Sequence, residues 1–170
     1  LEFGSSSTSQ SIAAYADLTY EGSPQFFITA GARYAHDSQS NVRSQAAFSV
    51  NNVATQADLD TVKGDRVTPR VVLRYKPTEE MSVYASYSKG YKSAFPERGG
   101  GVTNRTVKPE KIDAYEVGVK FDNRQITFEA AGFYYDYKVL QFSLYQSGQA
   151  LIVNAASAKI YGLDAQARFN

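Results

Sequence analysis

The most regular pattern of apolar and polar positions lies between residues 68 and 91. Two alternating segments are joined there by the short polar stretch 77–80. Val71 and Leu73 fall on one face of the first segment, and Arg70 falls on the other. Alternation with a period of two indicates a β-strand with one apolar and one polar face. Such a strand separates lipid from water in outer-membrane β-barrels.

The same alternation continues along the chain and predicts seven strands. We expect them at about 9–21, 25–37, 68–76, 81–91, 111–121, 125–145 and 150–169. The connections alternate in length, with short turns at 21–25, 76–81 and 122–125 and longer loops at 38–66, 92–109 and 146–149. Outer-membrane barrels have short periplasmic turns and longer extracellular loops. The sequence therefore predicts an all-β, antiparallel up-and-down β-barrel or barrel segment, with about seven to eight transmembrane strands.

An odd number of strands poses a problem of closure. The first and seventh strands of a meander point the same way, so they cannot complete a barrel by antiparallel pairing. Three alternatives remain open: an eighth strand from residues 45–53, an open sheet, or the pairing of two copies. Open strand edges promote association, so a homo-oligomer is expected in the last two cases.

Three longer motifs resemble the barrel of TonB-dependent outer-membrane receptors. They are TPRVVLRYKPTEEMSVYASYSKGYKS from residue 68, VKPEKIDAYEVGVK from residue 107 and NAASAKIYGLDAQ from residue 154. The resemblance implies a receptor of the bacterial outer membrane that imports a scarce ligand, such as a ferric siderophore, a vitamin or a glycan. It also implies contact with outer-membrane lipid and lipopolysaccharide, and with TonB only through a separate plug domain. The chain would then be a fragment of the C-terminal barrel domain that cannot transport by itself.

Composition narrows the possible partners and the domain organisation. The chain has 170 residues, a net charge of +1 and no cysteine. It carries no basic helix or dense basic stripe, so we expect no nucleic-acid partner. Residues 1–7 read as a cloning scar followed by a Gly-Ser linker. We therefore expect residues 8–170 to form a single barrel fragment without a plug domain.

One motif suggests a different class of protein. Ser86 and Lys89 match S-x-x-K, which supplies the nucleophile and the base in some serine hydrolases. In those enzymes the motif opens a helix, whereas here it lies in a predicted strand, where positions i and i+3 point to opposite sides. The companion motifs S-D-N and K-T-G are missing. We expect no catalytic residue, but a small β-barrel serine hydrolase or esterase is the alternative function.

Two further groups of polar residues could have a catalytic or metal-binding role, or could simply be exposed to solvent. His36 is the only histidine and precedes Asp37, so it could belong to a catalytic triad, but no G-x-S-x-G motif accompanies it. Asp58, Asp60 and Asp65 share a predicted loop, yet their spacing differs from that of an EF-hand. We therefore predict no metal site, and we expect no cofactor.

The loop at 92–109 and its flanks are basic. Six lysines and arginines lie between residues 89 and 111 against two glutamates. Lys92, Arg98 and Arg105 are the candidates for contact with an anionic ligand or with lipopolysaccharide phosphates. The simpler interpretation is a solvated charged loop.

Overall fold

The computed structural model describes residues 4–44, 60–97, 105–146 and 149–169. The strands in these ranges are β1 (Gly4–Ser23), β2 (Phe26–Ser44), β3 (Asp60–Tyr75), β4 (Met81–Lys92), β5 (Phe95–Glu97), β6 (Arg105–Val107), β7 (Glu110–Asp122), β8 (Ile126–Lys138), β9 (Gln141–Gln146), β10 (Gln149–Asn154) and β11 (Ser157–Phe169). A search of the same ranges finds no helix with the length and apolar character to cross a membrane.

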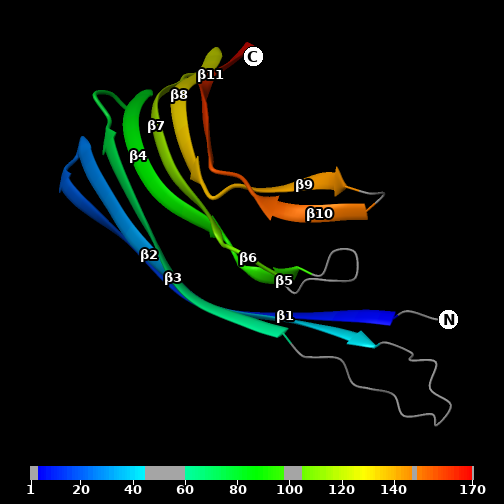
Figure 1. Ribbon diagram of the computed structural model, residues 1–170. Helices are drawn as coiled ribbons and strands as arrows, with labels where there is room; N and C mark the ends of the chain where they lie inside the picture. The colour runs from blue at the N-terminus through cyan, green and yellow to red at the C-terminus, as the bar shows by residue number, and fades with distance from the viewer. Residues whose placement is uncertain (1–3, 45–59, 98–104, 147–148, 170) are drawn as a thin grey trace, which may run out of the picture.

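Seven of the strands form one curved sheet in the order β1-β2-β3-β4-β7-β8-β11 (Figure 1). Every neighbouring pair is antiparallel. The predicted all-β class and meander order are therefore confirmed. The two edge strands, β1 and β11, do not pair with each other, so the described part of the chain is an open sheet rather than a closed barrel. The candidate eighth strand at 45–53 lies outside the described residues.

Two predicted boundaries are wrong at the end of the sheet that carries the long connections. Residues 38–44 and 60–66 were expected in a loop, but they extend β2 and β3, whose register continues to Asn41 opposite Asp60. The sequence predicts a linker at residues 4–7, but these residues pair with 41–44 in β1 and β2. The sequence of these extensions is mostly polar, so alternation cannot reveal them, and the backbone ladder continues nonetheless.

The sixth and seventh predicted strands are each broken near one end. Val139 has a φ of 57° between β8 and β9, a left-handed conformation that is rare for a β-branched residue. Its amide donates to Ala156 at 3.1 Å, and the Ala155 amide donates to Leu140 at 2.6 Å. The segments that follow β8 and precede β11 continue from there as the hairpin β9–β10. The predicted loop at 92–109 likewise contains the short hairpin β5–β6.

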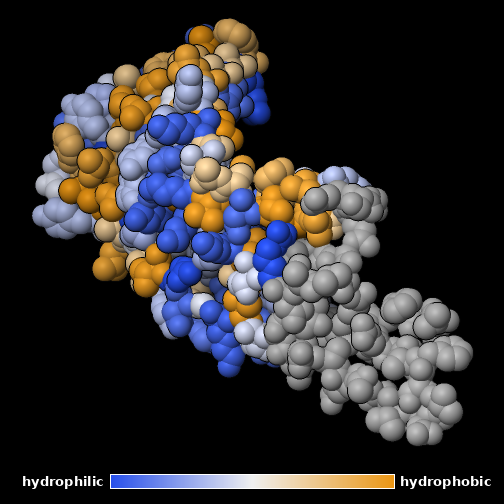
Figure 2. Space-filling model, viewed as in Figure 1, coloured by the Kyte–Doolittle hydropathy of each residue, from blue (hydrophilic) through white to orange (hydrophobic). Residues whose placement is uncertain are grey.

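The sheet has almost no apolar core of its own. Within the described residues, the buried apolar side chains are Ala35, Pro96 and Val107. Leu18, Leu163 and Tyr161 are 78%, 88% and 76% exposed. Figure 2 shows apolar residues gathered near the short turns and over the β9–β10 hairpin, with hydrophilic residues over the middle of the visible face. Contiguous exposed apolar surface of this kind marks contact with a membrane or another molecule.

The apolar face ends in a line of aromatic side chains, here called the tyrosine row. It consists of Tyr87, Tyr115, Tyr134 and Tyr161, which are in register across β4, β7, β8 and β11. The rings of Tyr87 and Tyr115 are 5.0 Å apart, and those of Tyr115 and Tyr134 are 6.3 Å apart. Tyrosines at this level form the interfacial girdle of a membrane barrel.

Candidate functional site

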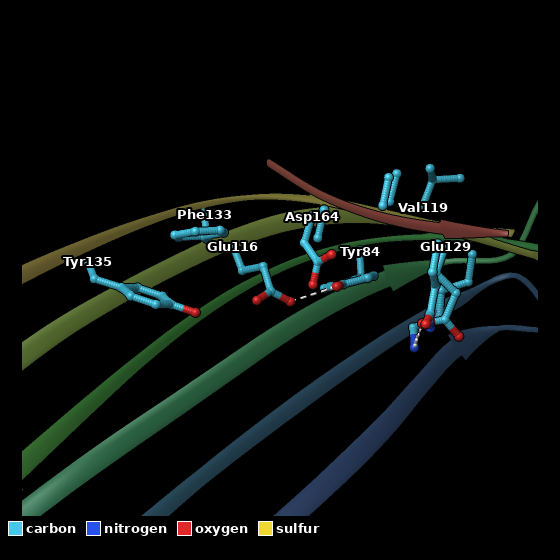
Figure 3. A pocket seen from close by; sticks show the side chains of 12 residues that line it. Tyr84, Glu116, Val119, Glu129, Phe133, Tyr135 and Asp164 are labelled. Atoms are coloured by element: carbon cyan, nitrogen blue, oxygen red, sulfur yellow. Dashed lines mark hydrogen bonds and ion pairs between the residues drawn. The ribbon is translucent and has the colours of Figure 1, made fainter. Parts of the chain in front are cut away.

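The polar face carries a hollow of about 280 Å³ over β4, β7, β8 and β11 (Figure 3). The Tyr84 hydroxyl donates a hydrogen bond to Glu116 Oε1 at 2.6 Å. Lys120 Nζ lies 3.2 Å from Glu129 Oε2, and the Gln166 amide donates to the same oxygen at 3.3 Å. The first bond joins β4 to β7, and the other two contacts join β7, β8 and β11.

The hollow is acidic, and its shape depends on a glycine. Its charged lining consists of Glu116, Glu129, Asp164 and Lys120. A Cβ added at Gly118 would lie 2.6 Å from the Tyr84 ring. Glycine at position 118 therefore lets the Tyr84 ring lie across β7, where its hydroxyl reaches the Glu116 carboxylate. The arrangement suits contact with a cationic or hydrogen-bond-donating group.

The polar face of β2 and β3 carries the opposite charge. Arg33, Arg70 and Arg74 all lie on it, in the phase opposite to the exposed apolar residues. Arg70 Nη1 is 3.8 Å from Asp17 Oδ1. The Arg74 guanidinium lies 4.6 Å from the centre of the Phe27 ring, at the distance of a cation–π contact. The polar face of the sheet, here called the polar wall, is thus basic over β2 and β3 and acidic over β4, β7, β8 and β11.

The two hairpins in the long connections are joined by side-chain hydrogen bonds. Arg105 Nη2 donates to the Ile152 carbonyl at 2.8 Å. The Lys108 amide donates to Asn154 Oδ1 at 2.8 Å, and the Asn154 amide nitrogen donates back to the Lys108 carbonyl at 3.0 Å. Gln141 Nε2 also donates to that carbonyl, at 2.9 Å. The hairpins β5–β6 and β9–β10 therefore form one unit beside the polar wall.

A buried carboxylate fastens this unit to β2, beyond the apolar band. Asp37 is 8% exposed and accepts hydrogen bonds from Tyr91 and, at 2.8 Å, from Ser93. Burial by itself raises the pKa of Asp37, but the hydroxyls of Ser11, Tyr91 and Ser93 outweigh it and lower the pKa below its ordinary value. The carboxylate therefore stays charged and holds the start of the β5–β6 connection.

The hydrolase candidates do not meet. Ser86 is in register with Glu116 on the polar face. Lys89 is in register with Asp113, and its Nζ lies 3.8 Å from that carboxylate on the opposite face. A nucleophile and its base must lie within hydrogen-bond reach. The geometry gives the serine hydrolase alternative no support.

The lone histidine takes part in an exposed polar cluster rather than a triad. His36 Nδ1 lies 2.8 Å from Asp65 Oδ1, and the Tyr34 hydroxyl donates to the same oxygen at 2.5 Å. The bonds from Tyr34 and then His36 lower the pKa of Asp65. Of the other loop aspartates, Asp58 lies outside the described residues, and only the backbone of Asp60 is described.

The three basic ligand candidates have separate positions. Lys92 is exposed at the end of β4, Arg105 holds the two hairpins together, and Arg98 lies outside the described residues. Sequence reasoning missed Tyr84 and Asn154. Tyr84 lies on the polar face of its strand, and the alternation of the sequence could have identified it. No sequence pattern marks Asn154, because its partner Lys108 belongs to a different loop.

The curved sheet, its polar wall and its exposed apolar band define a sector of an outer-membrane β-barrel. The family described as TonB dependent receptor-like, beta-barrel matches residues 2–170. The chain belongs to this family, whose members are outer-membrane proteins of Gram-negative bacteria. The resemblance of the three motifs is confirmed.

Individual relatives agree with this assignment. The pesticin receptor of Yersinia enterocolitica is 27% identical over 166 residues, which cover 95% of this chain and 24% of that receptor. The rhizobactin receptor of Rhizobium meliloti (strain 1021) is 22% identical over 183 residues, which cover 92% of this chain and 24% of that receptor. The structure of the ferric yersiniabactin uptake receptor from Yersinia pestis matches with a TM-score of 0.82 and 25% identity, covering 98% of this chain and 25% of that chain. The chain thus spans about a quarter of the length of these relatives.

Proposed function

We propose that the chain forms a sector of the barrel wall in a receptor that imports ferric siderophores. The observation that carries this proposal is the pair of joined hairpins beside a charged polar wall, at the end of the sheet that carries the long connections. The homologues include siderophore receptors, among them the rhizobactin receptor and the ferric yersiniabactin uptake receptor, and these favour such a ligand over a vitamin or a glycan. The hairpins would contact the ligand at the extracellular mouth, and the wall would contact a plug domain through which TonB acts.

The isolated chain is not transport-competent in this proposal. Its sheet is open at β1 and β11, so it encloses no channel. The test is a chimera in which residues 8–169 replace the matching segment of the ferric yersiniabactin uptake receptor. We expect the chimera to support growth on ferric yersiniabactin only in cells that contain TonB. A chimera that reaches the outer membrane but transports without TonB would contradict the proposal, as would flux through the isolated chain in proteoliposomes.

The control for the chimera separates assembly from transport. A second chimera keeps the sheet and replaces the hairpin β9–β10 with a short turn between Val139 and Ala156. We expect it to reach the outer membrane, as measured in membrane fractions, and to lose growth on the siderophore. Retained growth would show that the joined hairpins do not take part in uptake.

The isolated chain should also self-associate. In the described structure each edge strand leaves one row of backbone groups without a partner strand, and such edges pair readily with a second copy. Size-exclusion chromatography with light scattering in plain buffer should show dimers or larger species. A monodisperse monomer with a β spectrum would contradict this expectation.

A further inference from the structure

The hairpin β9–β10 lies in the longest uncharged stretch of the chain. Residues 139–158 contain no Asp, Glu, Lys, Arg or His. Phe142 pairs with Val153, and Leu144 pairs with Leu151. Directly opposite residues of an antiparallel pair lie on the same side of the sheet, about 5 Å apart, and so do residues two positions apart along a strand. These four side chains, here called the hairpin patch, therefore form one apolar surface.

Hydrogen bonds at the base of the hairpin hold it in place. Gln141 is 8% exposed, and its Nε2 donates to the carbonyls of Ser93 at 3.0 Å and Lys108 at 2.9 Å. Its backbone amide donates to Glu110 Oε2 at 2.7 Å. Gln141 is in register with Asn154, on the side of the hairpin opposite to the hairpin patch. The anchor thus fixes the hairpin without using the patch, which is preorganised for binding.

The hairpin patch is accessible and lies beyond the membrane girdle. Phe142 is 44% exposed, and the other three side chains of the patch are half-buried. β8 continues from Tyr134 of the tyrosine row to Lys138 before the hairpin begins, which is about 14 Å of strand. Hydrophobic surface covers the hairpin in Figure 2. Apolar surface that faces water rather than hydrocarbon marks a place where another molecule binds.

The size of the hairpin patch favours a small ligand over a protein partner. Two paired strands of six residues span about 17 Å by about 10 Å, or about 170 Å² on one side. Each partner in a stable protein interface contributes about 800 Å². The patch is too small for such an interface, but it is large enough for one or two aromatic rings. A ring packs favourably against a phenylalanine in a tilted or offset arrangement.

We propose that the hairpin patch selects ferric chelates that present an aromatic ring, namely those of the phenolate type. The ring would pack on Phe142, and the uncharged hairpin would not attract a chelate whose exterior carries only carboxylates and hydroxyls. Arg105, the cation that bonds to the hairpin, already donates to the Ile152 carbonyl. The inference rests on the proposed function, because that function places the hairpins at the extracellular mouth, and it adds the chemical class of the ligand.

The test is an NMR titration of the intact, isotope-labelled chain, folded in detergent micelles, with two diamagnetic gallium(III) complexes. One contains a bis-phenolate chelator, and the other is gallium(III) citrate, which has no aromatic ring. We expect the phenolate complex to shift signals of β9 and β10 and to bind at least about tenfold more tightly than the citrate complex. Phe142→Ser should weaken phenolate binding at least about tenfold, whereas Phe142→Tyr, which keeps the ring, should bind within about twofold of the original chain.

Tyr145→Ser is the matched control. Tyr145 is an aromatic residue of the same strand and is 82% exposed, but it lies on the side of the hairpin opposite to Phe142. Its loss should change the affinity by less than about twofold. Each variant should keep the original hydrogen exchange at the Lys108 amide, which shows that the base of the hairpin is intact. Titration of micelles without protein measures how far each complex enters the detergent by itself.

Four outcomes would overturn the inference. They are equal affinity for the two complexes after the detergent correction, unchanged phenolate binding in Phe142→Ser, equal losses in Phe142→Ser and Tyr145→Ser, and a protein dimer that forms through Phe142 and excludes the complex. The last would assign the patch to a second copy of the chain. The titration involves no uptake, so phenolate binding at the patch would stand even if the chimera failed to transport. Uptake by the chimera without such binding would overturn the inference alone.

Discussion

Ala85 and Ser86 allow the same charge to be placed on either side of the wall. They are adjacent small residues of β4, a strand inside the sheet. Ala85 is in register with Leu73 and Val117 in the apolar band, and Ser86 is in register with Glu116 on the polar face. An arginine on the lipid side of a barrel near the bilayer midplane costs about 2–4 kcal/mol. Ala85→Arg should therefore lower the free energy of unfolding by that amount, or about 30- to 900-fold in the folding equilibrium.

Ser86→Arg is the matched control, because its side chain enters water beside Glu116. It should change the free energy of unfolding by less than about 0.5 kcal/mol. Both variants are unfolded with urea from phospholipid vesicles and followed by circular dichroism, and a constant m-value confirms that the midpoint reports stability. Equal losses in the two variants would refute the assignment of the faces. A larger loss in Ser86→Arg would reverse it.

Three further outcomes are expected. Asn154→Ala removes two hydrogen bonds to Lys108, which join the hairpins, and a third to the Val139 carbonyl. The loss should destabilise the joined hairpins by about 2 kcal/mol and speed hydrogen exchange at the Lys108 amide; unchanged exchange would mean that the hairpins are held by other contacts. Tyr91→Phe should raise the pKa of Asp37 in an NMR titration and cost about 1–3 kcal/mol near neutral pH. Folding lowers the pKa of Asp37, so its carboxylate stabilises the fold at pH values above the ordinary pKa of an aspartate. This stabilisation should be lost as the pH falls through the pKa of Asp37 in the folded state. Ser86→Ala should leave any ester hydrolysis by the preparation unchanged, and a loss of turnover would revive the hydrolase alternative.

Alternation predicted the strands well only where the two faces meet different solvents. Between Val67 and Tyr75 one side faces lipid and the other water, and the period of two is clear. Near Asn41 and Asp60 the sequence is mostly polar, so the same antiparallel ladder continues without an alternating pattern. The break at Val139 was hidden for another reason, since a β-branched residue with positive φ is imposed by tertiary contacts rather than by local preference.

The candidate ligand residues were less predictable than the strands. Lys92 and Arg105 were selected by charge alone, and charge does not reveal that Arg105 donates to a backbone carbonyl in a different connection. Tyr84 could be assigned to the polar phase, but its partner Glu116 is 32 residues away in sequence. Side-chain contacts of this range depend on strand register, which the turns and the apolar face set together.

The stability of this sheet is a property of its surroundings as much as of its contacts. A soluble domain buries its apolar side chains against one another, but here Leu18 and Leu163 stay exposed and the buried apolar side chains of the described residues are few. The backbone ladder satisfies the peptide groups between strands, and lipid must cover the apolar band. In plain buffer the band would face water at a cost of about 25 cal/mol per Å². Association with further copies of the chain would cover the band. The isolated chain should therefore be monomeric only where a micelle or a bilayer covers the band instead.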